Sequence, residues 1–167
     1  MNNYDSTFFE YVNSGSILSA EHLLPLLHKE LDISNVLDVG CGLGAWLSAW
    51  EKLGVEDYIG IDGDYVNRST LLIPESKFIT ADLTAGFNLS RRFDLVQSLE
   101  VAEHLPAENA SLFIECLTSH GDIILFSAAP VGQGGDHHIN EQPYEYWRHI
   151  FKQFDYHAYD FIRPIIY

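Results

Sequence analysis

The stretch SLEVAEHLP, residues 98–106, places three groups able to move a proton or bind a cation directly after strand-forming residues. Glu100, Glu103 and His104 have i, i+3, i+4 spacing, so they share one face if a helical turn begins after the strand. Two carboxylates that close repel each other unless a proton or cation lies between them. The stretch therefore suits either general-base chemistry at His104 or cation binding. The alternative is that Glu100 supports the backbone beside a bound cofactor while Glu103 and His104 cap the next turn.

The elements that would position these groups can be read from the pattern of apolar residues. Short β-branched runs, NVLDV, DYIGI, KFIT, FDLVQSL and DIILFSAA, alternate with the helical patterns GAWLSAWEKLG, PAENASLFIECLTSHG and PYEYWRHIFKQF. Continuous apolar strands are typical of a parallel sheet covered on both faces. The pattern predicts a three-layer, doubly wound, Rossmann-like α/β fold with a mostly parallel sheet, and its helical aromatic residues are assigned to the core.

The segment before the first strand, SILSAEHLLPLLHKEL, predicts one or two helices that are interrupted or begin at Pro25. We expect residues 1–34 to form an N-terminal helical cap and residues 35–167 to form the ligand-binding unit of a single domain.

The formal net charge of −15 excludes some partners. A field of that sign repels phosphate backbones and anionic lipid, so neither nucleic acid nor a membrane surface is expected as a partner. The N-terminus lacks the pattern of a signal peptide, and no apolar run is long enough to span a bilayer. Cys41 and Cys116 form no metal or disulfide pattern, and we expect two reduced thiols in a cytoplasmic protein.

A glycine-rich loop, VLDVGCGLGAW, follows the first predicted strand. Glycines such as Gly40 and Gly42 let the backbone turn tightly and let a ligand approach closely. The glycine pattern alone also fits a dinucleotide. Asp38, however, would face the crevice, where its carboxylate repels a pyrophosphate and attracts an ammonium or sulfonium group. This favours S-adenosylmethionine over NAD.

Two further aspartates stand at the ends of the next two predicted strands. In YIGIDGD, Asp62 stands at the carboxyl end of the predicted second strand, where it can accept both ribose hydroxyls. In FITADL, Asp82 stands at the end of the predicted third strand, where it can accept from an adenine amino group, with Leu83 supplying an amide. Three carboxylates at three successive strand ends beside a glycine loop predict one nucleoside-binding crevice.

Taken in order, these motifs resemble those of class I S-adenosylmethionine-dependent methyltransferases. LDVGCGLG is similar to their first motif, GIDGD to the second-strand motif, ADL to the adenine motif, and FDLVQSLEVAEHL to the fourth-strand motif. The resemblance covers residues 36 to about 130. The cofactor-binding residues that follow from the motifs and this resemblance are Asp38, Gly40, Cys41, Gly42, Asp62, Gly63, Asp82, Leu83, Ser98 and Leu99.

The resemblance also bears on the C-terminus, because the chain ends at YDFIRPIIY, soon after an expected sixth strand. The family continues into a seventh strand, so we expect the C-terminal strand to be missing here. Its absence would leave an exposed sheet edge for a second copy or another partner.

The Glu-x-x-Glu-His pattern resembles that of small-RNA 2′-O-methyltransferases and of ubiquinone-pathway O-methyltransferases. The resemblance implies a divalent-cation site made of Glu100, Glu103, His104 and a later histidine. GGDHHINEQ supplies His137 and His138. The small-RNA match favours His137, whereas similarity of the HxNEQ loop to bacterial methyltransferases of undefined substrate favours His138, which we prefer. Such a ligand set suits Mn²⁺, Zn²⁺ or Fe²⁺ better than Mg²⁺.

The expected function is therefore methyl transfer from S-adenosylmethionine to a small-molecule acceptor, with a divalent cation as a further expected cofactor. An oxygen acceptor is favoured because His104, His138 or Glu103 could remove its proton. Two alternatives stay open at this point. One is a non-catalytic S-adenosylmethionine-binding subunit that needs a partner or a further C-terminal segment. The other is an NAD-dependent oxidoreductase.

Overall fold

The computed structural model describes residues 6–160 and residue 162. Within them, the helices and strands are α1 (Ser6–Glu30), β1 (Asn35–Val39), α2 (Ala45–Lys52), β2 (Asp57–Asp62), β3 (Phe78–Thr80), β4 (Leu95–Leu99), α3 (Ala110–His120), β5 (Ile124–Ser127) and α4 (Tyr144–Gln153). Short 3₁₀ turns are η1 (Arg68–Thr70), η2 (Glu75–Lys77), η3 (Ala102–His104) and η4 (Ala107–Asn109).

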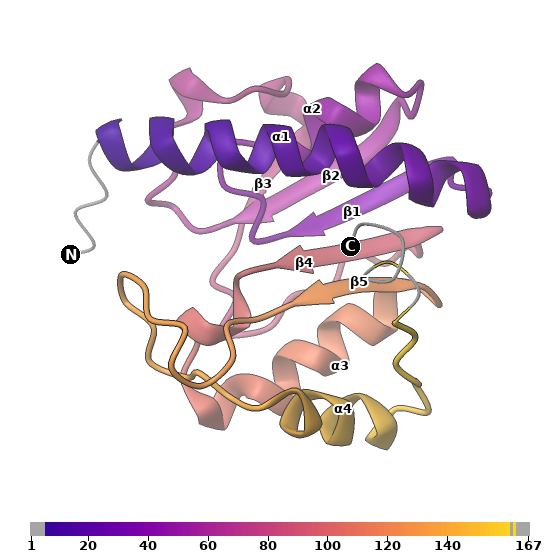
Figure 1. Cartoon of the computed structure of the whole chain (residues 1–167). Helices are drawn as coiled ribbons and strands as arrows, with labels where there is room; N and C mark the ends of the chain where they lie inside the picture. The colour runs from indigo at the N-terminus through magenta and orange to yellow at the C-terminus, as the bar shows by residue number, and fades with distance from the viewer. Residues whose placement is uncertain (1–5, 161, 163–167) are drawn as a thin grey trace.

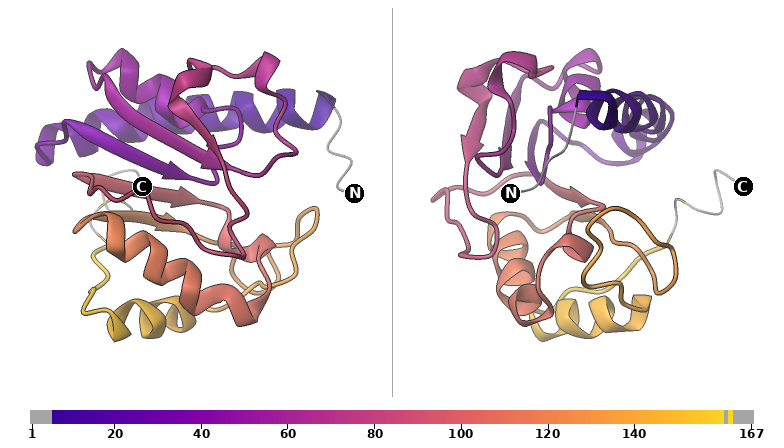
Figure 2. Two further views of the ribbon diagram at one scale, coloured as in Figure 1. Left: turned by 180° about the vertical axis from the view of Figure 1, so that it is seen from behind. Right: turned by 90° about the vertical axis from the view of Figure 1, so that its left-hand side faces the viewer.

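The five strands form one parallel sheet in the order β3-β2-β1-β4-β5. In the register of this sheet Asp38 lies opposite Gly60 on β2 and Gln97 on β4. Helices α1 and α2 cover one face of the sheet, and α3 and α4 cover the other (Figures 1 and 2). This confirms the predicted three-layer α/β fold. Because all strands run the same way, their carboxyl ends meet at one edge.

Alternate residues of the central strands supply the two halves of the core. Val36 and Leu95 pack with Trp50 on the side of α1 and α2. Leu37 and Val96, their neighbours in the chain, belong to the apolar cluster on the side of α3 and α4. Successive strand residues point to opposite faces, so a fully apolar strand is what two covered faces require.

Pro25 lies inside α1, which continues as one helix through it. Ala20, Leu24 and Leu27 lie on either side of the proline at helical spacing, and all three are buried in the cluster that includes α2. The packing of this face compensates for the backbone hydrogen bond that a proline removes. None of the helices in the described chain has the length and apolarity that crossing a bilayer requires.

The two later helices begin close to where the sequence predicts. Helix α3 starts at Ala110, after Pro106 and the turn η4, and Pro143 precedes α4. Trp147 of α4 is buried as predicted, but Tyr144 is 49% exposed and does not belong to the core. A sixth strand is expected shortly before the end of the chain, but residues 154–160, which follow α4, form no strand, and residues 161 and 163–167 lie outside the described part. Residue 162 forms no strand either.

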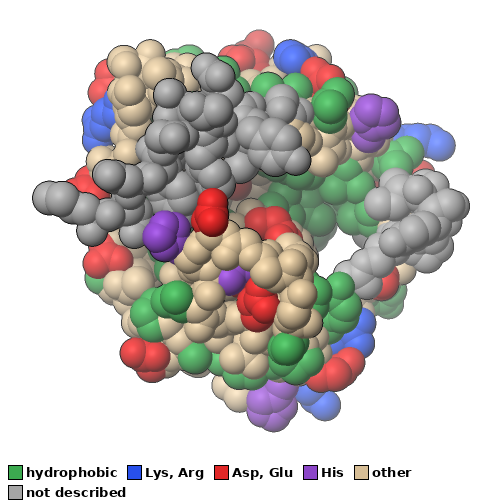
Figure 3. Space-filling model, turned by 60° about the vertical axis from the view of Figure 1, so that its left-hand side comes forward, with side chains coloured by type: hydrophobic (Ala, Val, Ile, Leu, Met, Phe, Trp, Pro, Cys, Tyr) green, Lys and Arg blue, Asp and Glu red, His purple; other side chains and the backbone are tan. Residues whose placement is uncertain are grey.

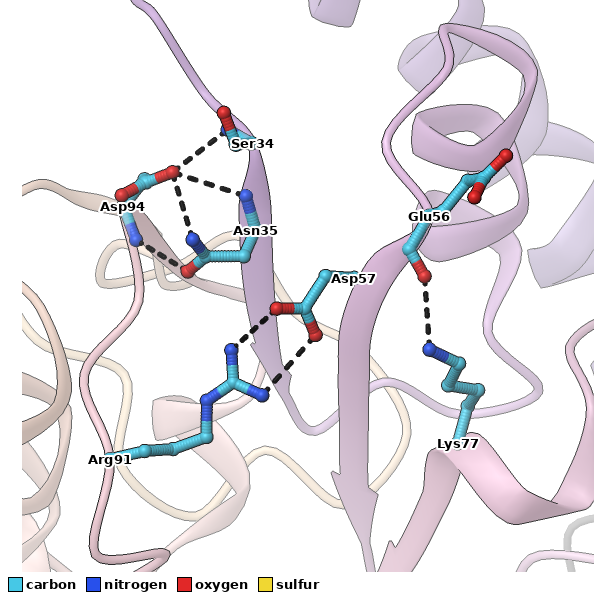
Figure 4. A network of polar contacts seen from close by, with 7 residues as sticks. All are labelled: Ser34, Asn35, Glu56, Asp57, Lys77, Arg91 and Asp94. Carbon is cyan, nitrogen blue, oxygen red and sulfur yellow. Dashed lines mark hydrogen bonds and ion pairs between the residues drawn. The ribbon is translucent and has the colours of Figure 1, made fainter.

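A polar network holds the amino ends of β1, β2 and β4 together (Figure 4). Asp94 Oδ2 accepts hydrogen bonds from the Ser34 N–H (2.8 Å), the Asn35 N–H (3.2 Å) and Asn35 Nδ2 (3.0 Å). The Asp94 N–H donates back to Asn35 Oδ1 (2.9 Å). Arg91 binds Asp57 through two contacts of 2.7 and 3.2 Å. These contacts fix the start of β4 at the edge opposite the strand carboxyl ends.

Candidate functional site

The glycine loop joins β1 to α2 at the carboxyl edge of the sheet. Gly40 and Gly42 have φ angles of 81° and 55°. The N–H groups of Gly40 and Cys41 both donate to the Ile61 carbonyl, at 2.8 and 3.2 Å. A Cβ atom on Gly40 would lie 2.3 Å from Val101 Cγ2. Glycine is therefore needed at position 40 for both its backbone angle and its contact with the turn that follows β4.

Asp38, on β1 just before this loop, is a buried carboxylate. Its Oδ2 has no hydrogen-bond partner in the described part of the chain. Burial raises the pKa of Asp38 to about 7; the Gln97 side chain opposes this rise, and the charge of Asp62 adds to it. A buried carboxylate with an unused oxygen is stabilised by a cationic ligand, so the pocket beside Asp38 suits a positively charged group.

Asp62, the last residue of β2, is buried and connects that strand to the glycine loop. Its Oδ2 accepts from the Gly42 N–H at 2.6 Å, and its Oδ1 accepts from the Gly63 N–H at 2.7 Å. The Tyr65 hydroxyl donates to the same Oδ1. Asp62 therefore fixes the position of the glycine loop relative to the tip of β2.

The other predicted nucleoside contacts lie farther along the same edge. Asp82 is exposed, and its Oδ1 accepts from the Thr84 N–H (2.9 Å) and hydroxyl (2.6 Å), which lower the pKa of Asp82. Leu83 is buried. Ser98 is fully buried, and its hydroxyl has no hydrogen-bond partner among the residues that the structure describes.

A cavity of about 1140 Å³ opens beside the glycine loop (Figure 3). Five of the predicted cofactor-binding residues line it: Asp38, Gly40, Cys41, Gly42 and Leu99. The other five do not line it: Asp62, Gly63, Asp82, Leu83 and Ser98. Away from the loop the cavity runs between α1 and the face of β4 and β5, where leucine side chains of α1 form much of its wall.

Glu100, Glu103 and His104 do not lie on one helical turn, so the condition on which their common face was predicted is not met. Glu100 has a φ of 56°, and its N–H donates to the Ser127 carbonyl and hydroxyl, both at 3.1 Å. Its exposed carboxylate accepts from Gln133 Nε2 at 3.1 Å. The helical turn η3 begins only at Ala102, so Glu100 stays outside it. Glu100 is exposed and has a left-handed backbone, but its charge still acts on Glu103 and His104, whereas Glu103 is buried.

Glu103 lies close to His104 and His138. The three side chains offer ligand atoms that all lie within 4.8 Å of one another. Glu103 has no exposed surface, and within the described chain neither carboxylate oxygen has a hydrogen-bond partner. Burial raises the pKa of Glu103 to about 7, and the charge of Glu100 adds to the rise. The structure thus brings together Glu103, His104 and His138, with Glu100 outside the group.

The two imidazoles meet edge to face, with ring centres 4.9 Å apart. His104 Nδ1 lies 3.3 Å from the His137 carbonyl oxygen, and His138 Nδ1 lies 3.0 Å from Glu141 Oε1. Burial, with His138 close by, lowers the pKa of His104. A neutral His104 can accept a proton at about pH 7.

The loop between β5 and α4 is bound directly to η3. The N–H groups of Ile139 and Asn140 both donate to the Glu103 carbonyl, at 2.9 and 3.0 Å. In the views of Figures 1 and 2 the loop lies beside η3 at the carboxyl edge of the sheet. Two segments far apart in the sequence therefore build one polar site.

Two residues of this region escaped prediction from the sequence. Gln97 is a fully buried amide on β4 whose Oε1 accepts from Trp50 Nε1 at 2.9 Å, beside Asp38. An amide inside an apolar strand was the available signal. Tyr65 hydrogen-bonds to Asp62 only because of the turn after β2, and no sequence pattern indicates that contact.

Comparisons with known proteins define the class to which this fold and site belong. Residues 17–160 match a family model described as "Methyltransferase domain". The chain belongs to this family, as its motifs predicted, and the oxidoreductase alternative is left without support.

One curated relative is a mitochondrial ubiquinone biosynthesis O-methyltransferase from Dictyostelium discoideum. The two are 28% identical over an alignment of 109 positions, and the match covers 55% of this chain and 33% of that protein. The chain therefore spans about a third of the length of this relative.

Solved structures share the fold. A SAM-dependent methyltransferase from Archaeoglobus fulgidus superimposes with a TM-score of 0.66 and 18% identity, over 90% of this chain and 73% of that one. The sugar N-methyltransferase KedS8 from a Streptoalloteichus species gives a TM-score of 0.62 and 20% identity, over 79% of this chain and 57% of that one.

Proposed function

We propose that this protein binds S-adenosylmethionine beside the glycine loop and transfers its methyl group to a small molecule. The observation that carries the proposal is the buried Asp38 carboxylate: its Oδ2 has no hydrogen-bond partner in the described chain, and the residue lines the cavity beside the glycine loop. A sulfonium and an ammonium group would supply the missing positive charge. In this proposal residues 35–167 form the cofactor-binding unit of a cytoplasmic protein, and residues 1–34 form a helical cap.

The contacts to the nucleoside come from the strand ends. Asp62 would accept the ribose hydroxyls in place of the Tyr65 hydroxyl that it now binds. Asp82 and the Leu83 amide would bind the adenine, and the backbone at Ser98 and Leu99 the methionine portion. The open space around Gly42, where a Cβ would meet nothing within 4 Å, suits a ligand that approaches the backbone closely.

An oxygen acceptor is favoured by the cluster of Glu103, His104 and His138. The cofactor supplies an activated methyl group, so the chain's own residues must align the acceptor, exclude water and take its proton. His104, neutral because its pKa is lowered, is suited to take the proton from a hydroxyl. The name of the Dictyostelium relative, an O-methyltransferase, supports the same choice.

The same three residues fit a divalent cation. The two buried Glu103 oxygens without hydrogen-bond partners in the described chain are what a cation site requires, and imidazole nitrogens favour Mn²⁺, Zn²⁺ or Fe²⁺. Glu103, His104 and His138 would hold the ion, with Glu100 outside the group. Such an ion lowers the pKa of a nearby hydroxyl.

Titration calorimetry with S-adenosylhomocysteine and with NAD tests the cofactor proposal. We expect one equivalent of S-adenosylhomocysteine to bind and NAD not to bind. Binding of NAD alone, or of neither, would contradict the proposal.

A further titration with Mn²⁺, after treatment with a chelator, tests the proposed ion site. We expect His138→Ala to abolish ion binding and His137→Ala to retain it, and an unmodified protein that binds no ion would exclude the metal.

A partner at the sheet edge completes the proposal. Among the described strands, β5 lies at an edge of the sheet and pairs with β4 alone. Edge strands offer unpaired backbone groups to a second copy or to another chain. Light scattering of the purified protein distinguishes a dimer from a monomer, and a monomer at all concentrations would exclude self-association.

A further inference from the structure

We propose that Glu141 is the residue that positions His138, by fixing which imidazole nitrogen carries the proton and by folding the loop that holds the ring. The inference rests on the proposed function in one respect, since it assumes that the Glu103, His104 and His138 cluster is the reactive site. Its geometrical part stands on the contacts of Glu141 alone.

Glu141 binds three groups of its own loop. Its Oε2 accepts from the Gly132 N–H at 2.8 Å, and its Oε1 accepts from the Gly134 N–H at 2.7 Å. The same Oε1 lies 3.0 Å from His138 Nδ1. One carboxylate thus closes the loop from residue 132 to residue 141 and holds the imidazole that this loop presents.

The contact with Glu141 determines the tautomer of His138. An ionised carboxylate can only accept a hydrogen bond, so the proton of a neutral His138 ring must lie on Nδ1. His104 has the same arrangement, because its Nδ1 faces the His137 carbonyl oxygen, another group that only accepts. Both rings therefore keep Nε2 as the basic nitrogen. Partners of this kind orient imidazoles that bind metals or move protons.

The backbone at Gly135 packs against the His138 ring on the side away from Glu141. A Cβ atom on Gly135 would lie 2.4 Å from His138 Nε2 and 2.5 Å from Cε1. Gly135 has a φ of 157°. The loop therefore holds Nδ1 through Glu141, and Gly135 packs so closely against the Nε2 side of the ring that a side chain at position 135 would collide with it.

The tautomer can be measured directly by ¹⁵N NMR of the imidazole ring at about pH 8.5, where histidines are neutral. We expect His138 to carry its proton on Nδ1 in the unmodified protein. Glu141→Ala removes the acceptor, so the ring should shift towards the Nε2-protonated form that free histidine prefers. Glu141→Gln should restore the Nδ1 form, because its oxygen can still face both Gly134 N–H and His138 Nδ1.

The matched control is Glu145→Ala, which removes an exposed carboxylate paired with Arg148. It should leave the His138 tautomer unchanged. An Nε2-protonated His138 in the unmodified protein would overturn the proposal. So would a folded Glu141→Ala protein that keeps the Nδ1 form.

The NMR experiment needs neither cofactor nor acceptor, so its result is independent of the proposed methyl transfer. A protein that fails to bind S-adenosylhomocysteine but shows the expected tautomers would therefore contradict the proposed function and support the role of Glu141.

Discussion

At the scale of single residues, the site is built from carboxylates that the fold buries at an energetic cost. Glu103 has no exposed surface and Asp38 has almost none. The pKa of each carboxyl group is raised to about 7. Burial of this kind destabilises the charged form in the free protein. A bound cation would offset the energetic cost of burying these carboxylates. Carboxylates with a strongly shifted pKa therefore often mark functional sites.

Asp38→Asn should raise stability and weaken cofactor binding at the same time. Because the pKa of Asp38 is raised by folding, its stabilising contribution is present below about pH 4 and is lost as the pH rises through about 7. At about pH 8 the Asp38→Asn variant should therefore unfold in urea with a free energy about 4 kcal/mol higher than that of the unmodified protein. The difference should shrink at about pH 5.

The same variant lacks the ionised carboxylate, so its affinity for S-adenosylmethionine should fall about 10-fold or more. Asp32→Asn, at an exposed position between α1 and β1, is the matched control and should change neither quantity. A variant that loses stability and keeps its affinity would show that Asp38 is a structural residue.

At the scale of elements, the network around Asp94 holds the strands whose carboxyl ends carry the site. Asp94→Ala would leave the N–H donors of Ser34 and Asn35 without their acceptor. We expect the free energy of unfolding to fall by about 1–3 kcal/mol. Since the network lies at the opposite edge of the sheet, the affinity for S-adenosylhomocysteine should not change.

The control for this change is Asp122→Ala, which removes an exposed partner of Arg92. Exposed ion pairs contribute about 0–1 kcal/mol, so this variant should differ little from the unmodified protein in chemical denaturation. An Asp94→Ala protein as stable as the control would contradict the role given to the network.

The strands and helices were predictable because their apolar periodicity is strong. NVLDV became β1 without change, and Asp38 and Asp62 lie at the sheet edge where the sequence placed them. The orientation of Glu100 was not predictable, because it depends on a positive φ and on hydrogen bonds to Ser127, which is distant in the sequence. The spacing of residues along the chain does not reveal contacts between distant segments. The closeness of His138 to Glu103 is a second contact of this kind.

At the scale of the whole molecule, the net charge of −15 acts against the compact state. Like charges repel, and the basic side chains are too few to neutralise the acidic ones. Raising the NaCl concentration should screen this repulsion and therefore raise the melting temperature. Differential scanning calorimetry at about 0.02 and 0.3 M NaCl measures the effect, where the Debye length shortens several-fold. A melting temperature that falls with salt would mean that attractive ion pairs dominate instead.

The central claim is that acidic residues around the glycine loop select a cationic sulfur nucleoside. Equilibrium dialysis of the unmodified chain with radiolabelled S-adenosylmethionine, with and without excess NAD, measures this selection most directly. We predict saturable uptake of one molecule per chain that excess S-adenosylhomocysteine displaces and excess NAD does not. No uptake, or displacement by NAD, would contradict the account.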